Sequence, residues 1–136
     1  MRNISAALTK CQMRDSAAAV AYGKPPIKDV TRRLGWLNAR AGERLQVCEK
    51  CQGLKPGQSL VKICVIEVVA VRREPLNALT YDVNYGRRET KREGFALHPE
   101  VMGDPQRFVA FFCRTHKDCT PATEVTRIEF RYEGKR

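Results

Sequence analysis

The sequence has no long apolar run and too few acidic residues to balance its basic ones. No stretch approaches the roughly 20 apolar residues that a membrane-spanning helix needs. Lys10, Arg14 and Asp15 interrupt the small apolar stretches near the N-terminus, so a secretory signal peptide is not expected either. We therefore expect a cytoplasmic protein without membrane contact, in which the six cysteines stay mostly reduced.

Several familiar catalytic motifs are also missing. The sequence contains no HExxH, no GxSxG and no Rossmann glycine series, and "GLKPGQSL" at 53–60 lacks the GK[ST] ending of a phosphate-binding loop. His98 and His116 are the two histidines, and neither lies in a context typical of a Ser-His-Asp triad. The common metalloprotease, serine hydrolase and nucleotide-binding classes are therefore disfavoured.

Positive charge is the strongest compositional feature. Lys and Arg number 25 against 15 Asp and Glu, a formal net charge of +10. Such an excess favours polyanionic partners, RNA or DNA first. Arg32, Arg33, Arg72 and Arg73 form two pairs that could bind phosphates, and Trp36 could stack on a base. The alternative is that Trp36 belongs to the core and the arginines only keep the surface soluble.

The length and apolar content fit a single domain, residues 1–136, of which 43% are hydrophobic. The strongest strand signal is 60–74, "LVKICVIEVVAVRRE", whose nearly continuous apolar character predicts burial on both faces. The residues of 123–133 alternate, which predicts a half-buried strand with one face toward the core and one charged face toward solvent. The first face has Thr126, Ile128, Phe130 and Tyr132, and the second has Arg127, Glu129 and Arg131. Shorter strands are expected near 2–8, 29–34 and 44–49.

Helices are expected at the margins of these strands. "GDPQRFVAFFCRTH" offers Asp104 as N-cap, Pro105 at the first helical position and a stripe of phenylalanines after them. An alanine-rich helix should end near Val20, and a weaker one is expected over 89–95. Short strands with helices at their margins predict a compact α+β barrel.

The cysteines allow three interpretations. Zinc could be bound by members of two groups, Cys48 with Cys51, and Cys113 with His116 and Cys119. The "CEKC" pair could also be a redox site. The second spacing is irregular for zinc, and Cys113 falls on the apolar side of its expected helix. Unpaired thiols, structural or on the surface, are therefore favoured, with no metal or other cofactor.

The segment "KDVTRR" groups residues that could do chemistry. Lys28 lies beside Arg32 and Arg33, which would lower its pKa and suit it to act as a base. Thr31 offers a hydroxyl that could attack a carbonyl or hold a water, and a distant carboxylate would have to protonate the leaving amine. The alternative is a solvated lysine that precedes an ordinary strand threonine.

Three short motifs follow one another along the chain: Lys28-x-x-Thr31-x-Arg33, then Gly42-Glu43-x-Leu45 at the start of a strand that ends at Glu49, then Glu93-Gly94-Phe95 before a helix. Their order resembles the ASCH (activating signal cointegrator homology) domain, a superfamily similar to PUA RNA-binding domains. The resemblance covers nearly the whole chain and is greatest to small stand-alone bacterial and phage members. Pro26 stands where the family often has glycine.

The resemblance implies a small PUA-like β-barrel with flanking short helices, which binds RNA or a modified nucleoside in a cleft at the barrel mouth. The sequence does not show the oligomeric state, and we expect a monomer. Some small bacterial members hydrolyse the amide of N4-acetylcytidine with a lysine, a threonine and a glutamate, which Lys28, Thr31 and Glu93 match. Glu49 matches a further acidic position of the cleft. Other members imply a non-catalytic nucleic-acid-binding module or a ribonuclease. Together with the charge pattern, this gives the expected ligand-binding residues Arg32, Arg33, Trp36, Glu49, Arg72 and Arg73.

Overall fold

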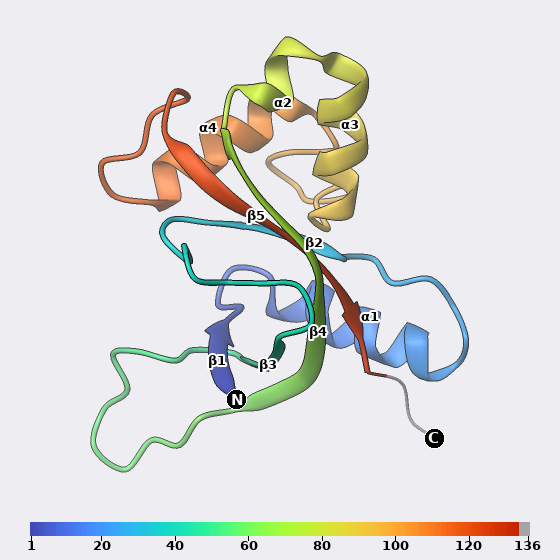
Figure 1. The fold of residues 1–136 in the computed structure, drawn as a ribbon, viewed down its shortest axis with the longest axis vertical. Coiled ribbons are helices and arrows are strands. Elements are labelled where there is room, and N and C mark those ends of the chain that lie inside the picture. The colour runs from blue at the N-terminus through green and yellow to red at the C-terminus, as the bar shows by residue number, and fades with distance from the viewer. Residues whose placement is uncertain (134–136) are drawn as a thin grey trace.

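A computed structural model describes residues 1–133 of the protein, which form one sheet and four helices (Figure 1). In chain order the elements are β1 (Arg2–Ser5), α1 (Lys10–Ala21), β2 (Val30–Arg33), β3 (Arg44–Cys48), β4 (Lys62–Pro75), α2 (Ala78–Tyr81), α3 (Val83–Arg92), α4 (Pro105–Thr115) and β5 (Glu124–Tyr132). No helix in this part of the chain is both long and apolar enough to cross a membrane.

The sheet has five strands in the order β1-β3-β4-β5-β2. β1 runs parallel to β3, whereas the other neighbours are antiparallel. Long, twisted β4 and β5 cross the molecule from the region of α1 to that of α2, α3 and α4 (Figure 1). The α+β prediction is confirmed, but the sheet curls into a half-barrel that stays open between its edge strands, β1 and β2.

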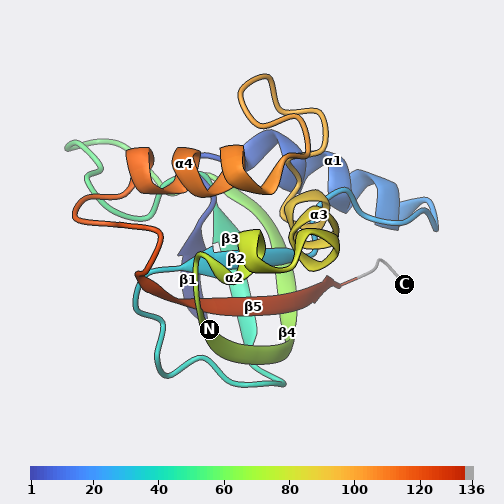
Figure 2. The same ribbon diagram turned by 90° about the horizontal axis from the view of Figure 1, so that it is seen from above.

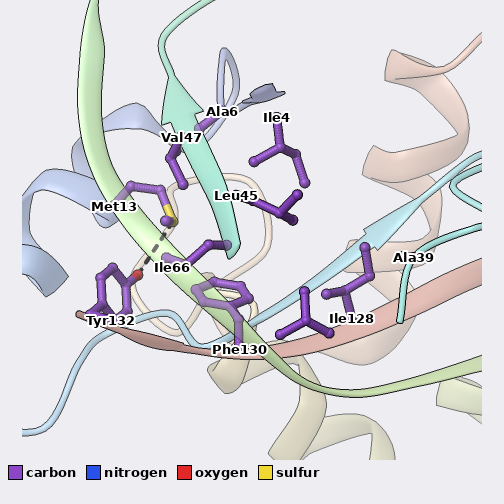
Figure 3. Packing of buried hydrophobic residues seen from close by; sticks show 11 residues of the cluster. Ile4, Ala6, Met13, Ala39, Leu45, Val47, Ile66, Ile128, Phe130 and Tyr132 are labelled. Carbon is purple, nitrogen blue, oxygen red and sulfur yellow. Dashed lines mark hydrogen bonds between the residues drawn. The ribbon is translucent and has the colours of Figure 1, made fainter. Parts of the chain in front are cut away.

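Two apolar clusters form the core. The first fills the half-barrel and is closed on one side by Met13 of α1, whose sulfur accepts a hydrogen bond from the Tyr132 hydroxyl at 3.3 Å (Figure 3). The second lies among α2, α4 and the start of β5, and includes Leu76, Leu79, Phe95, Phe108 and Phe112. Figure 2 shows α1, α3 and α4 on the same side of β5.

The prediction that β4 is buried on both faces is wrong. Ile66 and Val68 are 1% exposed and point into the half-barrel, but Val69 is 44% exposed. The pairing register shifts between Val68 and Ala70, which marks a bulge in this strand. Because β4 pairs antiparallel on both sides and the helices lie over one face of the sheet, its other face meets solvent.

The alternation in β5 is confirmed for its apolar residues and wrong for one charged residue. Ile128, Phe130 and Tyr132 are buried as expected. Arg127 is also buried, at 3% exposed, because Glu89 of α3 covers that face of the strand. A pattern with period two identifies the two faces of a strand, but it does not show whether a helix packs on the charged one.

The helix predictions hold in part. α4 begins as expected, with Pro105 as its first residue and the Asp104 carboxylate accepting a hydrogen bond from the Gln106 amide. α1 is confirmed over Lys10–Ala21. The weak helix expected over 89–95 is α3, which begins earlier, at Val83, and ends at Arg92. The short helix α2 was not expected from the sequence.

Candidate functional site

A cavity of about 220 Å³ lies where the half-barrel is open, between its two edge strands and α4. Ser5 of β1 and Thr31 of β2 border it on the strand side. Two further residues line it: Lys28, in the loop before β2, and Glu93, the first residue after α3. The structure thus brings the three predicted catalytic residues, Lys28, Thr31 and Glu93, to one cavity.

The backbone of Lys28 is held by residues from both ends of the chain. The hydroxyl of Ser16, a buried residue of α1, accepts hydrogen bonds from the Ile27 and Lys28 amides at 3.0 Å each. The Tyr132 hydroxyl donates to the Lys28 carbonyl at 2.6 Å. Gly94 has φ +92°, and a Cβ there would lie 3.1 Å from the Lys28 Cβ. Position 94 therefore favours glycine, which has no Cβ and readily adopts a positive φ.

The Lys28 ammonium is buried, with 2% of the residue exposed. Its Nζ donates to the Val30 carbonyl at 2.8 Å, the Glu93 carbonyl at 2.9 Å and the Glu93 Oε1 at 3.1 Å. Burial lowers the pKa of Lys28, and Arg33 and Arg32 lower it further, whereas the Glu93 carboxylate opposes them. The arginines act as the sequence suggested, but burial is the largest cause.

Thr31 and Arg33 lie on the same face of β2, and both also border a small void of about 10 Å³ inside the half-barrel. The Thr31 Oγ1 accepts a hydrogen bond from the Arg33 Nε at 3.0 Å. Because the hydroxyl accepts from a cation, its own proton is free to point to another acceptor. A cationic donor also stabilises the oxygen if it becomes negatively charged.

Arg32 points to the opposite face of β2, where it is paired inside the protein. Its guanidinium nitrogens lie 2.9 Å from Glu74, 2.7 Å from Glu89 and 2.9 Å from Glu93. On the neighbouring strand, Arg127 Nη2 donates to Glu89 Oε2 at 3.0 Å. Burial by itself would raise the pKa of Glu89, but the hydrogen bonds from Arg127 and Arg32 outweigh it and lower the pKa to about 2.

These contacts make a nearly neutral buried cluster between the two apolar clusters. At its centre three cations pair with three carboxylates: Lys28, Arg32 and Arg127 with Glu74, Glu89 and Glu93. Two more exposed cations and two more exposed carboxylates join at the margin: Arg72, Arg92, Asp29 and Glu129. Arg32 borders the cavity, yet its carboxylate partners already occupy its terminal nitrogens. Its predicted role in ligand binding therefore has little geometric support, although its buried Nε has no hydrogen-bond partner within residues 1–133.

The other predicted ligand-binding residues do not line this cavity. Glu49 pairs with Arg14 of α1. Trp36 is partly buried against the first apolar cluster, with the Arg2 guanidinium 4.7 Å from its ring centroid. Its position agrees better with the core alternative than with a platform for stacking a base.

Arg72 and Arg73 lie on β4, away from the cavity lining. Arg72 is paired with Glu74 at 3.1 Å and also donates to the Tyr85 hydroxyl. Arg73 donates to the Thr126 hydroxyl at 2.9 Å. Both side chains are close to half exposed. They could contact a polyanion on the outer surface, but not a ligand that occupies the cavity.

The alternative zinc ligands do not gather into one site. Among residues 1–133, no group of three or more His, Cys, Asp or Glu side chains is placed to hold a metal ion. Cys113 Sγ lies 3.8 Å from Cys119 Sγ, and burial, with Cys119, raises the pKa of Cys113 to about 11. Burial, with Cys51, also raises the pKa of Cys48. A raised pKa disfavours the thiolate, which is the form that binds zinc or attacks a disulfide.

An aromatic wall of the cavity was missed by the sequence analysis. Phe95 and, on α4, Phe108, Phe111 and Phe112 line the side opposite Thr31, and His116 stacks on Phe112 with ring centroids 3.9 Å apart. Helical periodicity identified the apolar face of α4 but not that part of it borders a cavity. A signal for this wall was His116: it comes four residues after Phe112, so on a helix it lies on the same face and continues the aromatic stripe.

Removing the Ser16 hydroxyl should displace Lys28. Ser16→Ala leaves the buried Lys28 amide and the partly buried Ile27 amide without their acceptor, so we expect the free energy of unfolding to fall by about 1–3 kcal/mol. Urea denaturation measures this loss. Ser59→Ala, in an exposed loop, is the control and should change stability by no more than about 0.5 kcal/mol. Equal stability of the two variants would show that Ser16 does not hold the lysine loop.

Neither a family model nor a curated protein matches this chain. Among solved structures it is similar to protein EF3133 from Enterococcus faecalis V583, described under the family model DUF984. The TM-score is 0.47 with 14% sequence identity, over 90% of this chain and 69% of that one. A similarity of this degree identifies no residue of the cavity.

Proposed function

We propose that the protein is a PUA-like domain of the ASCH type that binds a modified nucleoside in its cavity and hydrolyses an N-acyl amide such as that of N4-acetylcytidine. The observation that carries the proposal is the meeting of Lys28, Thr31 and Glu93 at one cavity, although Glu93 is far from the other two in sequence. A base, a nucleophile and a proton donor are the groups that amide hydrolysis requires.

The size and wall of the cavity fit a single acylated base. Ligand pockets for drug-sized molecules measure about 300–1,000 Å³, so a cavity of about 220 Å³ suits a smaller ligand. The phenylalanines of α4 and Phe95 offer aromatic faces for a base. RNA would therefore enter this site one unstacked base at a time.

The Lys28–Glu93 pair can supply both the base and the acid. Their Nζ and Oε1 atoms are 3.1 Å apart, so one proton can move along this hydrogen bond. The result is a neutral amine and a carboxylic acid, with no change in net charge. Burial lowers the pKa of Lys28 and so favours the neutral amine.

Acylation starts from the neutral pair. The Lys28 amine takes the proton of the Thr31 hydroxyl as the oxygen attacks the acyl carbon. The tetrahedral intermediate then collapses, the C–N bond breaks, and the Glu93 carboxyl gives its proton to the departing nitrogen of cytidine. This leaves an ammonium and a carboxylate, the ion pair seen in the structure.

Hydrolysis of the Thr31 ester restores the starting state. Glu93 takes a proton from water as the water oxygen attacks the ester carbon, and Lys28 returns a proton to the Thr31 oxygen. The free acid leaves, and the amine and carboxylic acid are formed again. A route in which Lys28 activates water directly has the same proton balance.

One observation favours the non-catalytic alternative, a nucleic-acid-binding module. The three acceptors around the Lys28 Nζ match the three N–H groups of an ammonium ion, and a neutral amine would donate only two hydrogen bonds. In that alternative Lys28 keeps its charge, and the net charge of +10 binds phosphates, with an affinity that falls steeply as salt increases.

The test is deacylation of N4-acetylcytidine, followed by mass spectrometry. We expect turnover by the wild type and a loss of about 10²–10⁴-fold in Lys28→Met, since general acid–base catalysis contributes that much. Thr31→Val should lose a similar factor if Thr31 is the nucleophile. Arg87→Gln, on the exposed face of α3, is the control and should keep wild-type turnover. Circular dichroism would check that each variant is folded.

Two results would overturn the enzymatic proposal. The first is no turnover by folded wild-type protein, and the second is unchanged turnover by Lys28→Met. The binding alternative would be supported if, in addition, RNA affinity decreased with salt and Lys28→Met weakened it only modestly.

A further inference from the structure

Arg33 is the cation at the cavity that no carboxylate neutralises. Lys28 and Arg32 line the same space, but both are paired with Glu93, whose Oε1 and Oε2 are thereby occupied. Within residues 1–133, Arg33 makes no ion pair, and its hydrogen-bond partner is the Thr31 hydroxyl. Since the rest of the charged cluster balances, the cavity carries one unpaired positive charge.

The position of this charge is unfavourable for the protein alone. Arg33 borders the void inside the half-barrel together with Ile66, Phe130 and Met13. Burial lowers the pKa of Arg33, and its electrostatic interactions with Glu93 and Cys51 only partly oppose this. Arg33 is partly buried, so its charge is only partly solvated, and a bound counter-ion would offset the cost of having no ion-pair partner in the described chain.

The geometry of the guanidinium shows where such a counter-ion would lie. Its Nε is used by Thr31, whereas both Nη groups lack a protein acceptor within the described chain and keep contact with solvent. An anion bound to the Nη groups would therefore be beside the Thr31 hydroxyl. In the proposed reaction, that is where the acyl group of the substrate lies.

The charge count selects the kind of anion. One unpaired cation is balanced by a single negative charge, which a carboxylate carries and which a phosphate monoester exceeds. A planar guanidinium also matches the two oxygens of a carboxylate. The phenylalanine wall suits the short apolar chain that such an acid carries.

We propose that Arg33 forms a binding site for one small carboxylate beside Thr31, which takes the acid released from the acyl group, so that short-chain carboxylates bind the free protein. The identity of this carboxylate as the reaction product rests on the proposed function, whereas the binding itself does not. The same Nη groups would face the oxyanion of the tetrahedral intermediate.

The experiment is titration of the wild type with sodium acetate at constant ionic strength, with sodium chloride as the replaced salt, followed by amide NMR and thermal unfolding. We expect saturable shifts at Thr31 and Arg33 and a rise in Tm, since acetate binds the folded state. Arg33→Gln should bind acetate about 10- to 100-fold more weakly, the loss expected for a charged hydrogen-bonded contact. Arg33→Lys keeps the charge but lacks the two parallel N–H donors of a guanidinium, so it should bind acetate with intermediate affinity.

Arg40→Gln, an exposed arginine outside the cavity lining, is the matched control and should bind like the wild type. Equal acetate affinity in the wild type and a folded Arg33→Gln would overturn the inference, as would tighter binding of inorganic phosphate than of acetate. Acetate binding through Arg33 without turnover of N4-acetylcytidine would refute the proposed function and keep the carboxylate site. Turnover without Arg33-dependent acetate binding would keep the proposed function and refute the carboxylate site.

Discussion

Glu89→Gln is expected to lower the free energy of unfolding by about 3–5 kcal/mol at pH 7, because it removes one partner from a buried ion cluster. Glu89 is 1% exposed and binds both Arg32 and Arg127. Arg32 would keep Glu74 and Glu93, but within residues 1–133 Arg127 would keep only the partly exposed Glu129, at 3.3 Å. Urea denaturation measures the loss.

The same variant should respond less to acid. The pKa of Glu89 is lowered from 4.5 to about 2 in the folded protein, so the unfolded chain binds the proton more readily between these values. Stability is therefore present above pH 4.5 and is lost as pH falls toward 2, with a contribution of about 3 kcal/mol. Glu89→Gln lacks this contribution, so its stability should fall less steeply than that of the wild type over this range.

Glu67→Gln is the control, because Glu67 pairs with Arg131 on the surface at 2.8 Å. Exposed pairs contribute about 0–1 kcal/mol, so this variant should stay close to the wild type and keep its acid dependence. If Glu89→Gln were as stable as Glu67→Gln, the buried cluster would not stabilise the fold.

Gly86→Ala is the second substitution with a large expected effect. A Cβ at Gly86 of α3 would lie 1.8 Å from the Leu79 carbonyl oxygen and 2.9 Å from the Pro105 Cβ. The obstacle includes backbone, so the helices α2 and α3 would have to separate. We expect the free energy of unfolding to fall by about 3 kcal/mol or more, at the upper end of the usual cost of overpacking.

Helix propensity alone predicts that Gly86→Ala raises the free energy of unfolding. In an exposed helix, alanine is more stable than glycine by about 1 kcal/mol, so a stabilised Gly86→Ala would contradict the close packing of α3 on α2. Asn84→Ala, on the exposed side of the same helix, is the control and should change the free energy of unfolding by no more than about 0.5 kcal/mol. Urea denaturation of both variants provides the comparison.

The candidate site could be predicted only in part. The spacing of Lys28, just before β2, and Thr31, on that strand, is a local feature, and the family resemblance supplied Glu93. Neither showed that Lys28 and Glu93 pair, since their contact depends on the fold between them. The sequence also did not assign different roles to the adjacent Arg32 and Arg33. Neighbouring residues of a strand face opposite sides, but which side is covered by acidic residues of α3 depends on packing.

The sequence by itself determined most of the helices and strands and the sign of the net charge. Local signals such as the Asp104-Pro105 start of α4 and the alternation in β5 depend on near neighbours, so the chain alone carries them. Only the tertiary structure decided which faces are buried. It left one face of β4 open, buried Arg127 under α3, and left Arg33 unpaired at the cavity. These outcomes depend on contacts between residues far apart in sequence, which no local pattern specifies.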